Sequence, residues 1–178
     1  MTDLPELAEP APDLIDPIIG YRQWRLVRGA LTSLFNDTRW ERVQLSARCH
    51  GGDHHPEVVP EHACSCGIYA YYDPCPRTAS AVTRELVAGA VVMWGRVELH
   101  GTGLRAEHAR IVGLELPLSL GPKRRHVLQV ADQLGVAAVP HRQLRSVARE
   151  HGAPVDQSLR PPRVRQPVVS SWRWSLVS

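Results

Sequence analysis

The sequence predicts an α+β fold, in which an antiparallel, barrel-like β-sheet with a zinc-bound loop precedes a C-terminal helical hairpin. Three observations support this prediction. Residues 20–119 consist mainly of strand-like segments separated by turn residues. All four cysteines of the chain lie between positions 49 and 75. The hydrophobic period then changes to that of amphipathic helices in residues 120–153.

The 178 residues suit one domain with appended segments. A hydrophobic content of 43% and a charged content of 22% exclude wholesale disorder. We expect a disordered, acidic, Pro-rich leader (1–19), a β-rich zinc-binding domain (20–119), a helical hairpin (120–153) and a basic Pro/Arg-rich tail (154–178). No apolar run approaches the ~20 residues of a membrane span, and the acidic start is unlike a signal peptide, so we expect a cytoplasmic protein.

The first strands are predicted from β-forming residues on both sides of short turns. Residues 21–27 and 31–35 flank Arg28-Gly29 and predict a hairpin. A third strand is expected over 42–48, where Val43, Leu45 and Ala47 alternate with polar residues. A short strand over 68–72 follows the cysteine-rich loop.

The longest apolar stretch covers residues 86–100 and predicts a central strand. Gly95 lies within this stretch and indicates a bend at a β-bulge. The sequence His100-Gly101-Thr102-Gly103 supplies a turn, so residues 104–112 are expected to return as the antiparallel partner of the central strand.

Two amphipathic helices are predicted after the sheet. Val127, Val130, Ala131 and Leu134 define one face of a helix that begins near Pro122 and ends at Gly135. Pro140 suits the first turn of a second helix that stops by Gly152. The same pattern fits an αα-hairpin packed on the sheet and a helix-turn-helix, and the sequence leaves both open.

The cysteine cluster predicts a metal site. Residues 50–62 have no hydrophobic period, and bound zinc would explain so long a polar loop. Zinc takes four tetrahedral N or S ligands, and we expect Cys49, Cys64 and Cys66 to supply three. His54 and His62 are the leading candidates for the fourth, with His55 and Cys75 as the other possibilities. Thiolate-rich ligation and the absence of an H-E-x-x-H motif favour a structural role, while ordinary reduced thiols and a catalytic thiol are the alternatives.

The net charge of +3 conceals an asymmetry along the chain. Residues 1–119 carry a net charge of −4 and residues 120–178 a net charge of +7. A basic third favours an anionic partner, so we expect a zinc-stabilised regulatory binding module that contacts DNA or RNA rather than an enzyme. Attraction between the two parts explains the charge equally well, and a metal-dependent hydrolase or a protein–protein interaction module are the alternative functions. The candidate contact residues are Arg124, Arg125, Arg142, Arg145, Arg163 and Arg165.

Three segments in fixed order carry a resemblance. They are Gly20-Tyr21-Arg22-x-Trp24, Cys64-Ser65-Cys66-Gly67-Ile68-Tyr69-Ala70, and Trp94-Gly95-Arg96-Val97-x-x-His100-x-x-Gly103-x-Arg105-Ala106-Glu107-x-Ala109. From Gly20 to Pro162 the chain resembles a group of small bacterial proteins typical of actinobacteria, for which no activity is established. The resemblance implies a bacterial cytoplasmic protein and adds weight to Cys64 and Cys66.

Overall fold

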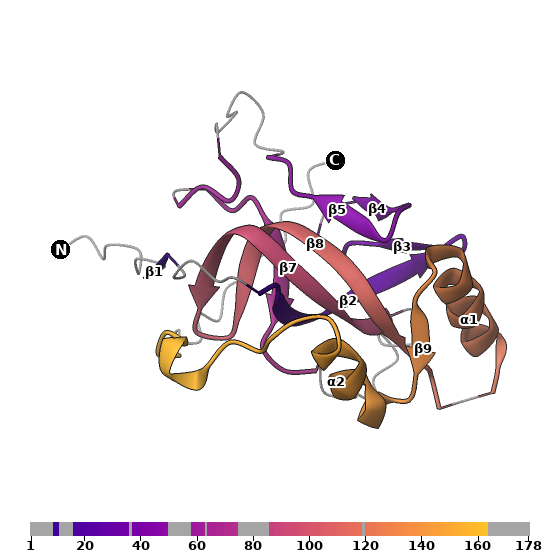
Figure 1. The fold of residues 1–178 in the computed structure, drawn as a ribbon. Coiled ribbons are helices and arrows are strands. Elements are labelled where there is room, and N and C mark those ends of the chain that lie inside the picture. The colour runs from indigo at the N-terminus through magenta and orange to yellow at the C-terminus, as the bar shows by residue number, and fades with distance from the viewer. Residues whose placement is uncertain are drawn as a thin grey trace, which may run out of the picture.

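The computed structural model describes residues 9–10, 16–35, 37–49, 58–62, 64–74, 86–118 and 120–163. In this part of the chain nine strands form one sheet that is antiparallel except for one strand pair, and helices pack against it (Figure 1). The strands are β1 (Glu9–Pro10), β2 (Ile18–Val27), β3 (Ala30–Thr32), β4 (Arg39–Trp40), β5 (Gln44–Ser46), β6 (Ile68–Tyr71), β7 (Leu86–His100), β8 (Gly103–Glu115) and β9 (Ala137–Val139). The helices are α1 (Pro122–Leu134), α2 (His141–Arg149) and the short 3₁₀ helix η2 (Gln157–Leu159). The α+β class predicted from the sequence is confirmed.

The strands β7 and β8 form a long hairpin at the centre of the sheet. Their register shifts between Trp94 and Val97, where Gly95 has a φ of +78°. The predicted turn, bulge and partner strand are therefore confirmed. The predicted first hairpin is also present, because β2 and β3 pair around a turn in which Arg28 and Gly29 have positive φ values of 48° and 74°.

The pairing of the central strands forms a circuit. β7 pairs with β8, β8 with β6, β6 with β2, and β2 again with β7. The β6–β2 link consists of the single residue pair Tyr71–Tyr21. The circuit is thus paired over several residues on three sides and by a single residue pair on the fourth, between β6 and β2.

Successive residues of β2 face two different parts of the core. Ile18 and Trp24 belong to a large cluster with residues of β6, β7, β8 and α1, whereas Ile19 and Tyr21 pack with Leu144 and other residues of a smaller cluster under α2. This alternation follows from the two-residue period of a strand. Both faces of β2 are therefore buried along this stretch.

The two predicted helices are present at the predicted places. α1 begins at Pro122 and is ended by Gly135, which has a φ of +66°. The segment between the helices differs from the predicted turn, because residues 137–139 form β9 and pair in parallel with β8. A strand hydrogen-bonded to the sheet holds the helices apart: α1 packs on β8 and β9, and α2 on β7, β8 and β9. The helices are therefore two separate covers of the sheet.

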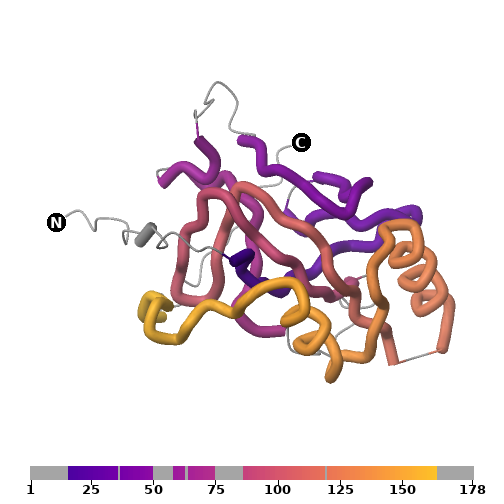
Figure 2. The backbone as a smooth tube through the Cα atoms, in the orientation of Figure 1, coloured from indigo at the N-terminus to yellow at the C-terminus, as the bar shows by residue number. Residues whose placement is uncertain are grey.

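The chain after α2 runs back along the molecule, as the yellow tube in Figure 2 shows. Ile18 forms a parallel bridge with Ala153, and the carbonyl of Pro162 approaches Gly101 in the β7–β8 turn. Part of the predicted leader is also ordered, since Glu9 and Pro10 pair with Leu99 and Glu98 of β7. Both segments are rich in proline, yet both contact the sheet, one by backbone pairing and the other by a bridge and close packing.

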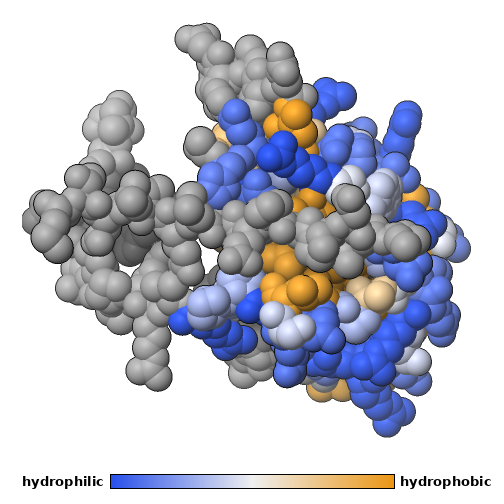
Figure 3. Space-filling view, turned by 60° about the vertical axis from the view of Figure 1, so that its left-hand side comes forward, coloured by the Kyte–Doolittle hydropathy of each residue, from blue (hydrophilic) through white to orange (hydrophobic). Residues whose placement is uncertain are grey.

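One face of the described chain is mainly hydrophilic, with a patch of hydrophobic residues near its centre (Figure 3). None of the helices in the described part is long and apolar enough to cross a membrane.

Candidate metal centre

The strands β5 and β6 pair, one after the other, with the same edge of β8. The Ala47 N–H donates to the Glu107 carbonyl at 2.7 Å, and Ile68 pairs with the neighbouring residue Ala106. The chain therefore leaves this edge after Ala47 and returns to it at Ile68, one β8 position further on. Residues 48–67 therefore form a connection between two segments that pair with adjacent positions of β8. Cys49 lies at one end of this connection, and Cys64 and Cys66 lie at the other.

The three predicted thiol ligands come together at the base of this connection. The Sγ atoms of Cys49, Cys64 and Cys66 all lie within 4.8 Å of one another, and none of the three cysteines is in a disulfide. The Cys49 and Cys64 Sγ atoms are 3.6 Å apart. Two thiolates on one tetrahedral zinc ion lie about 3.8 Å apart, because each Zn–S bond is about 2.3 Å long. The spacing of the thiols thus fits a shared metal ion.

A tight turn presents the two cysteines at the returning end. The Cys64 N–H donates to the Glu61 carbonyl at 3.0 Å, and the Glu61 N–H donates to Cys66 Sγ at 3.4 Å. Gly67 follows with a φ of +123°, a backbone conformation that favours glycine. An N–H group aimed at sulfur stabilises a thiolate, so the turn both places Cys66 and favours its metal-binding form.

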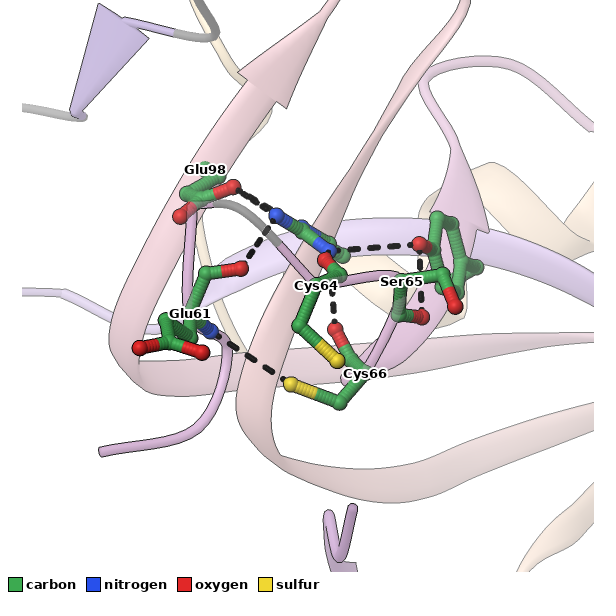
Figure 4. Close-up of polar contacts among 7 residues, drawn as sticks. Glu61, Cys64, Ser65, Cys66 and Glu98 are labelled. Atoms are coloured by element: carbon green, nitrogen blue, oxygen red, sulfur yellow. Dashed lines mark hydrogen bonds and ion pairs between the residues drawn. The ribbon is translucent and has the colours of Figure 1, made fainter. Parts of the chain in front are cut away.

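Arg105 of β8 fastens this turn to the sheet. Its guanidinium donates to the carbonyl oxygens of Cys64, Cys66 and Glu61, the last two at 3.0 Å. The other side of the guanidinium binds the carboxylate of Glu98 on β7, with Nε at 2.8 Å and Nη2 at 2.5 Å from the same Oε2 (Figure 4). Both side chains are only 4% exposed. The Glu98–Arg105 pair therefore couples the backbone of the cysteine turn to the two central strands.

The charges around the centre favour a bound cation. Burial raises the pKa of the Cys66 thiol, the Glu61 N–H opposes the shift, and the nearby Cys64 and Cys49 raise the pKa further. Three thiolates this close together repel one another unless a cation lies between them. Burial lowers the pKa of Arg105, but the hydrogen bond and charge of Glu98 outweigh it and raise the pKa overall, so the guanidinium remains charged.

Among the predicted fourth ligands, His62 lies within the described residues. His62 is exposed, and the group of mutually close ligand atoms contains the three thiols without it. His62 therefore does not lie with the three thiols in this structure. His54, His55 and Cys75 lie outside the described residues, so each stays a prediction.

The predicted nucleic-acid contacts are spread over two helices and the segment beyond them. Arg125, Arg142 and Arg163 are exposed. Arg124 instead donates to the Pro117 carbonyl at 3.0 Å, and Arg145 binds Asp73 Oδ1 at 3.1 Å. Arg165 lies outside the described residues. Part of the basic charge is thus engaged in contacts within the chain.

The sequence-based reasoning missed the pairing of Glu98 with Arg105, although a signal for it existed. The predicted turn His100–Gly103 sets a register in which residues 98 and 105 face each other, as the structure shows. The groove that Arg22, Arg42 and Arg48 line beside the cysteines was also missed. No sequence period indicates a groove made from separate strands.

Comparison with models of known protein families, with curated proteins and with solved structures finds no match for this chain. The class of the protein therefore follows from its own geometry: a chain with a mainly antiparallel sheet, two helices and a three-cysteine cluster that could hold a metal ion.

Proposed function

We propose that this protein is a zinc-stabilised binding module with a regulatory role, and that its partner is nucleic acid. The observation that carries the proposal is the convergence of the Cys49, Cys64 and Cys66 sulfur atoms within 4.8 Å. Thiolate-rich zinc sites are mostly closed structural sites, whereas catalytic zinc sites keep an open position. The three sulfur donors therefore favour a structural rather than a catalytic ion.

The position of the centre supports a structural task. The ion would join Cys49, where the chain leaves the edge of β8, to Cys64 and Cys66, where it returns. It would close residues 48–67 into a loop anchored at its base, and closing a long loop in this way stabilises the folded state. We propose that the ion and the β7–β8–β6–β2 circuit together maintain a barrel-like sheet.

Nucleic acid is proposed as the partner because of charge. The last 59 residues carry a net charge of +7, and a surface of that sign attracts phosphate backbones. Arg125, Arg142 and Arg163 have exposed side chains and are free to contribute.

Native mass spectrometry with elemental analysis tests the metal, using wild-type protein and the Cys64→Ser variant. We expect one zinc ion per wild-type chain and a loss of zinc in the variant. A labelled DNA strand, titrated at several salt concentrations, tests the partner, and binding should weaken steeply with salt. Purified protein without stoichiometric metal, melting at the same temperature with and without chelator, would contradict the zinc proposal. Binding that does not depend on salt would contradict the nucleic-acid proposal.

A further inference from the structure

An open groove of about 1300 Å³ lies beside the candidate metal centre. It runs between the β2–β3 hairpin on one side and β5 and β6 on the other, and we call it the arginine groove. Its lining includes Arg22, Arg42, Arg48, Phe35, Tyr69 and Tyr71. All three clustered cysteines line the same groove, so an ion at the centre would support one of its walls. The groove is larger than the roughly 300–1,000 Å³ of ordinary small-molecule pockets.

Arg22 supplies a partly buried positive charge to the groove. Its guanidinium carbon lies 5.4 Å from the ring centre of Trp24 and 5.1 Å from that of Trp40. Nη2 donates to Ser33 Oγ at 3.3 Å, while the buried Nε has no hydrogen-bond partner, and no carboxylate of the described residues forms an ion pair with this side chain. Burial lowers the pKa of Arg22 to about 10. A buried charge without a counter-charge is unfavourable, so the protein gains by binding an anion here.

The rest of the lining shares this polarity. Arg42 and Arg48 have exposed side chains, and no aspartate or glutamate is among the described residues that line the groove. The acidic N-terminal part of the sequence thus contains a locally basic groove. The lining that the structure describes thus favours an anionic ligand.

An exposed aromatic ring accompanies the arginines. Phe35 lines the groove and is 96% exposed. Tyr69 and Tyr71 alternate with the buried residues Ile68 and Ala70 along β6, so their rings face the side of the strand away from Arg22. An exposed ring beside a basic groove offers a surface on which a nucleic-acid base can stack. Bases offer their faces to a protein when the strand is unpaired, since in a duplex neighbouring base pairs cover those faces.

We infer that the arginine groove binds single-stranded nucleic acid, with phosphates at Arg22, Arg42 and Arg48 and a base stacked on Phe35. This inference rests on the proposed function and specifies both the form of the nucleic acid and the surface that holds it. The groove between β2–β3 and β5–β6 is thus a contact surface in addition to the basic C-terminal third.

Fluorescence anisotropy of the zinc-loaded full chain with a labelled oligothymidylate of about 12 nucleotides tests the inference. Arg22 packs against the rings of Trp24 and Trp40, so its replacement also changes stability, and exposed residues provide the test variants. Phe35→Ala should weaken binding about fivefold or more, the loss of one stacked base. The double variant Arg42→Gln/Arg48→Gln should reduce the slope of log affinity against log salt by about 1.4, about 0.7 for each lost phosphate contact.

Matched controls separate these effects from general ones. Leu120→Ala removes a side chain that is 83% exposed and lies away from the groove lining. Arg28→Gln/Arg96→Gln removes two exposed charges that neither line the groove nor lie in the basic C-terminal third. Both controls should leave the affinity within about twofold of wild type, since exposed changes away from a site have small effects.

The outcomes distinguish the groove from the proposed function. If Phe35→Ala and Arg42→Gln/Arg48→Gln bind as wild type while Arg125→Gln/Arg142→Gln loses affinity, the groove is wrong and the nucleic-acid function stands. Equal affinity for a duplex of the same length, or full competition by a mononucleotide at the oligonucleotide's own concentration, also overturns the inference. If neither strand form binds, the nucleic-acid part of the proposed function fails together with it, whatever the zinc content.

Discussion

Glu98 and Arg105 form an ion pair that is buried between β7, β8 and the cysteine turn, with Arg105 Nη2 2.5 Å from Glu98 Oε2. The remaining donors of Arg105 hold three backbone carbonyls of residues 61–66. A planar guanidinium can satisfy four acceptors at once, whereas an ammonium presents a single compact charge. The cysteine turn is therefore fixed to the sheet through one side chain, independently of any metal.

Replacing Glu98 should destabilise the protein strongly. Glu98→Gln removes the charge that compensates buried Arg105, and breaking one side of a buried pair costs about 3–5 kcal/mol. The expected result is a lower midpoint in urea unfolding monitored by circular dichroism, at an unchanged slope.

Arg105→Lys should also weaken zinc binding, because one ammonium cannot hold the carbonyls of the turn.

An exposed ion pair provides the comparison. Arg145 and Asp73 lie 3.1 Å apart, and both side chains are about half exposed. Asp73→Asn removes this pair and a longer contact of 3.7 Å to Arg160, and it should cost less than about 1 kcal/mol, because solvent screens such pairs. Similar losses in Glu98→Gln and Asp73→Asn would contradict the role assigned to the buried pair.

The fourth zinc ligand is predicted to come from residues other than His62. His62 is exposed and does not join the three thiols, so His62→Ala should retain one zinc ion per chain. His54→Ala should lose zinc to a chelator more readily than wild type does, because a site with three protein ligands holds the metal less completely than one with four. The measurement is competition with a coloured zinc chelator.

Two results would change this assignment. Loss of zinc in His62→Ala would show that the turn rearranges around the metal. Unchanged zinc retention in His54→Ala, together with loss in Cys75→Ser, would instead indicate a four-cysteine site.

The sequence predicted those parts of the fold that depend on local patterns. Gly95 marks the bulge in β7, and Gly135 ends α1, because both positions need a backbone conformation that glycine adopts easily. The strand β9 escaped prediction because three residues are too few to show a period, and its parallel pairing depends on the distant strand β8.

The parts of the candidate site that depend on local sequence were also predictable. Clustering along the chain indicated Cys49, Cys64 and Cys66, since ligands close in sequence need little folding to meet. Arg22 could not be recognised as a groove residue from the sequence. Its environment depends on Trp40, a residue of another strand, which packs against it only in the folded sheet. Burial of a charge is a property of the assembled sheet.

The bulge at Gly95 should tolerate no side chain. A Cβ there would lie 2.7 Å from Glu107 Oε2 and 3.0 Å from Glu107 Cβ, at a φ of +78°. Gly95→Ala should lower stability by roughly 1–3 kcal/mol, measured by thermal unfolding. Gly29→Ala is the matched control, since Gly29 has a similar φ of +74° with nothing within 4 Å of the added atom. Equal losses in the two variants would show that φ alone, without crowding, sets the cost.

Gly67 should matter for metal retention as well as for stability. Its φ is +123°, and an added Cβ would lie 3.2 Å from Pro60 Cβ and 3.3 Å from Arg105 Cδ. Gly67→Ala therefore strains the residue next to Cys66 and presses on the side chain that holds the turn, at a cost of roughly 1–3 kcal/mol. Because the ligands must be in place for the ion to bind, part of this cost should appear as weaker zinc affinity, up to about tenfold for each 1.4 kcal/mol. Chelator competition measures that affinity, with Gly29→Ala again as the control that keeps wild-type retention. A Gly67→Ala protein that melts lower yet holds zinc as tightly as wild type would show that the ion, and not Arg105, sets the geometry of the turn.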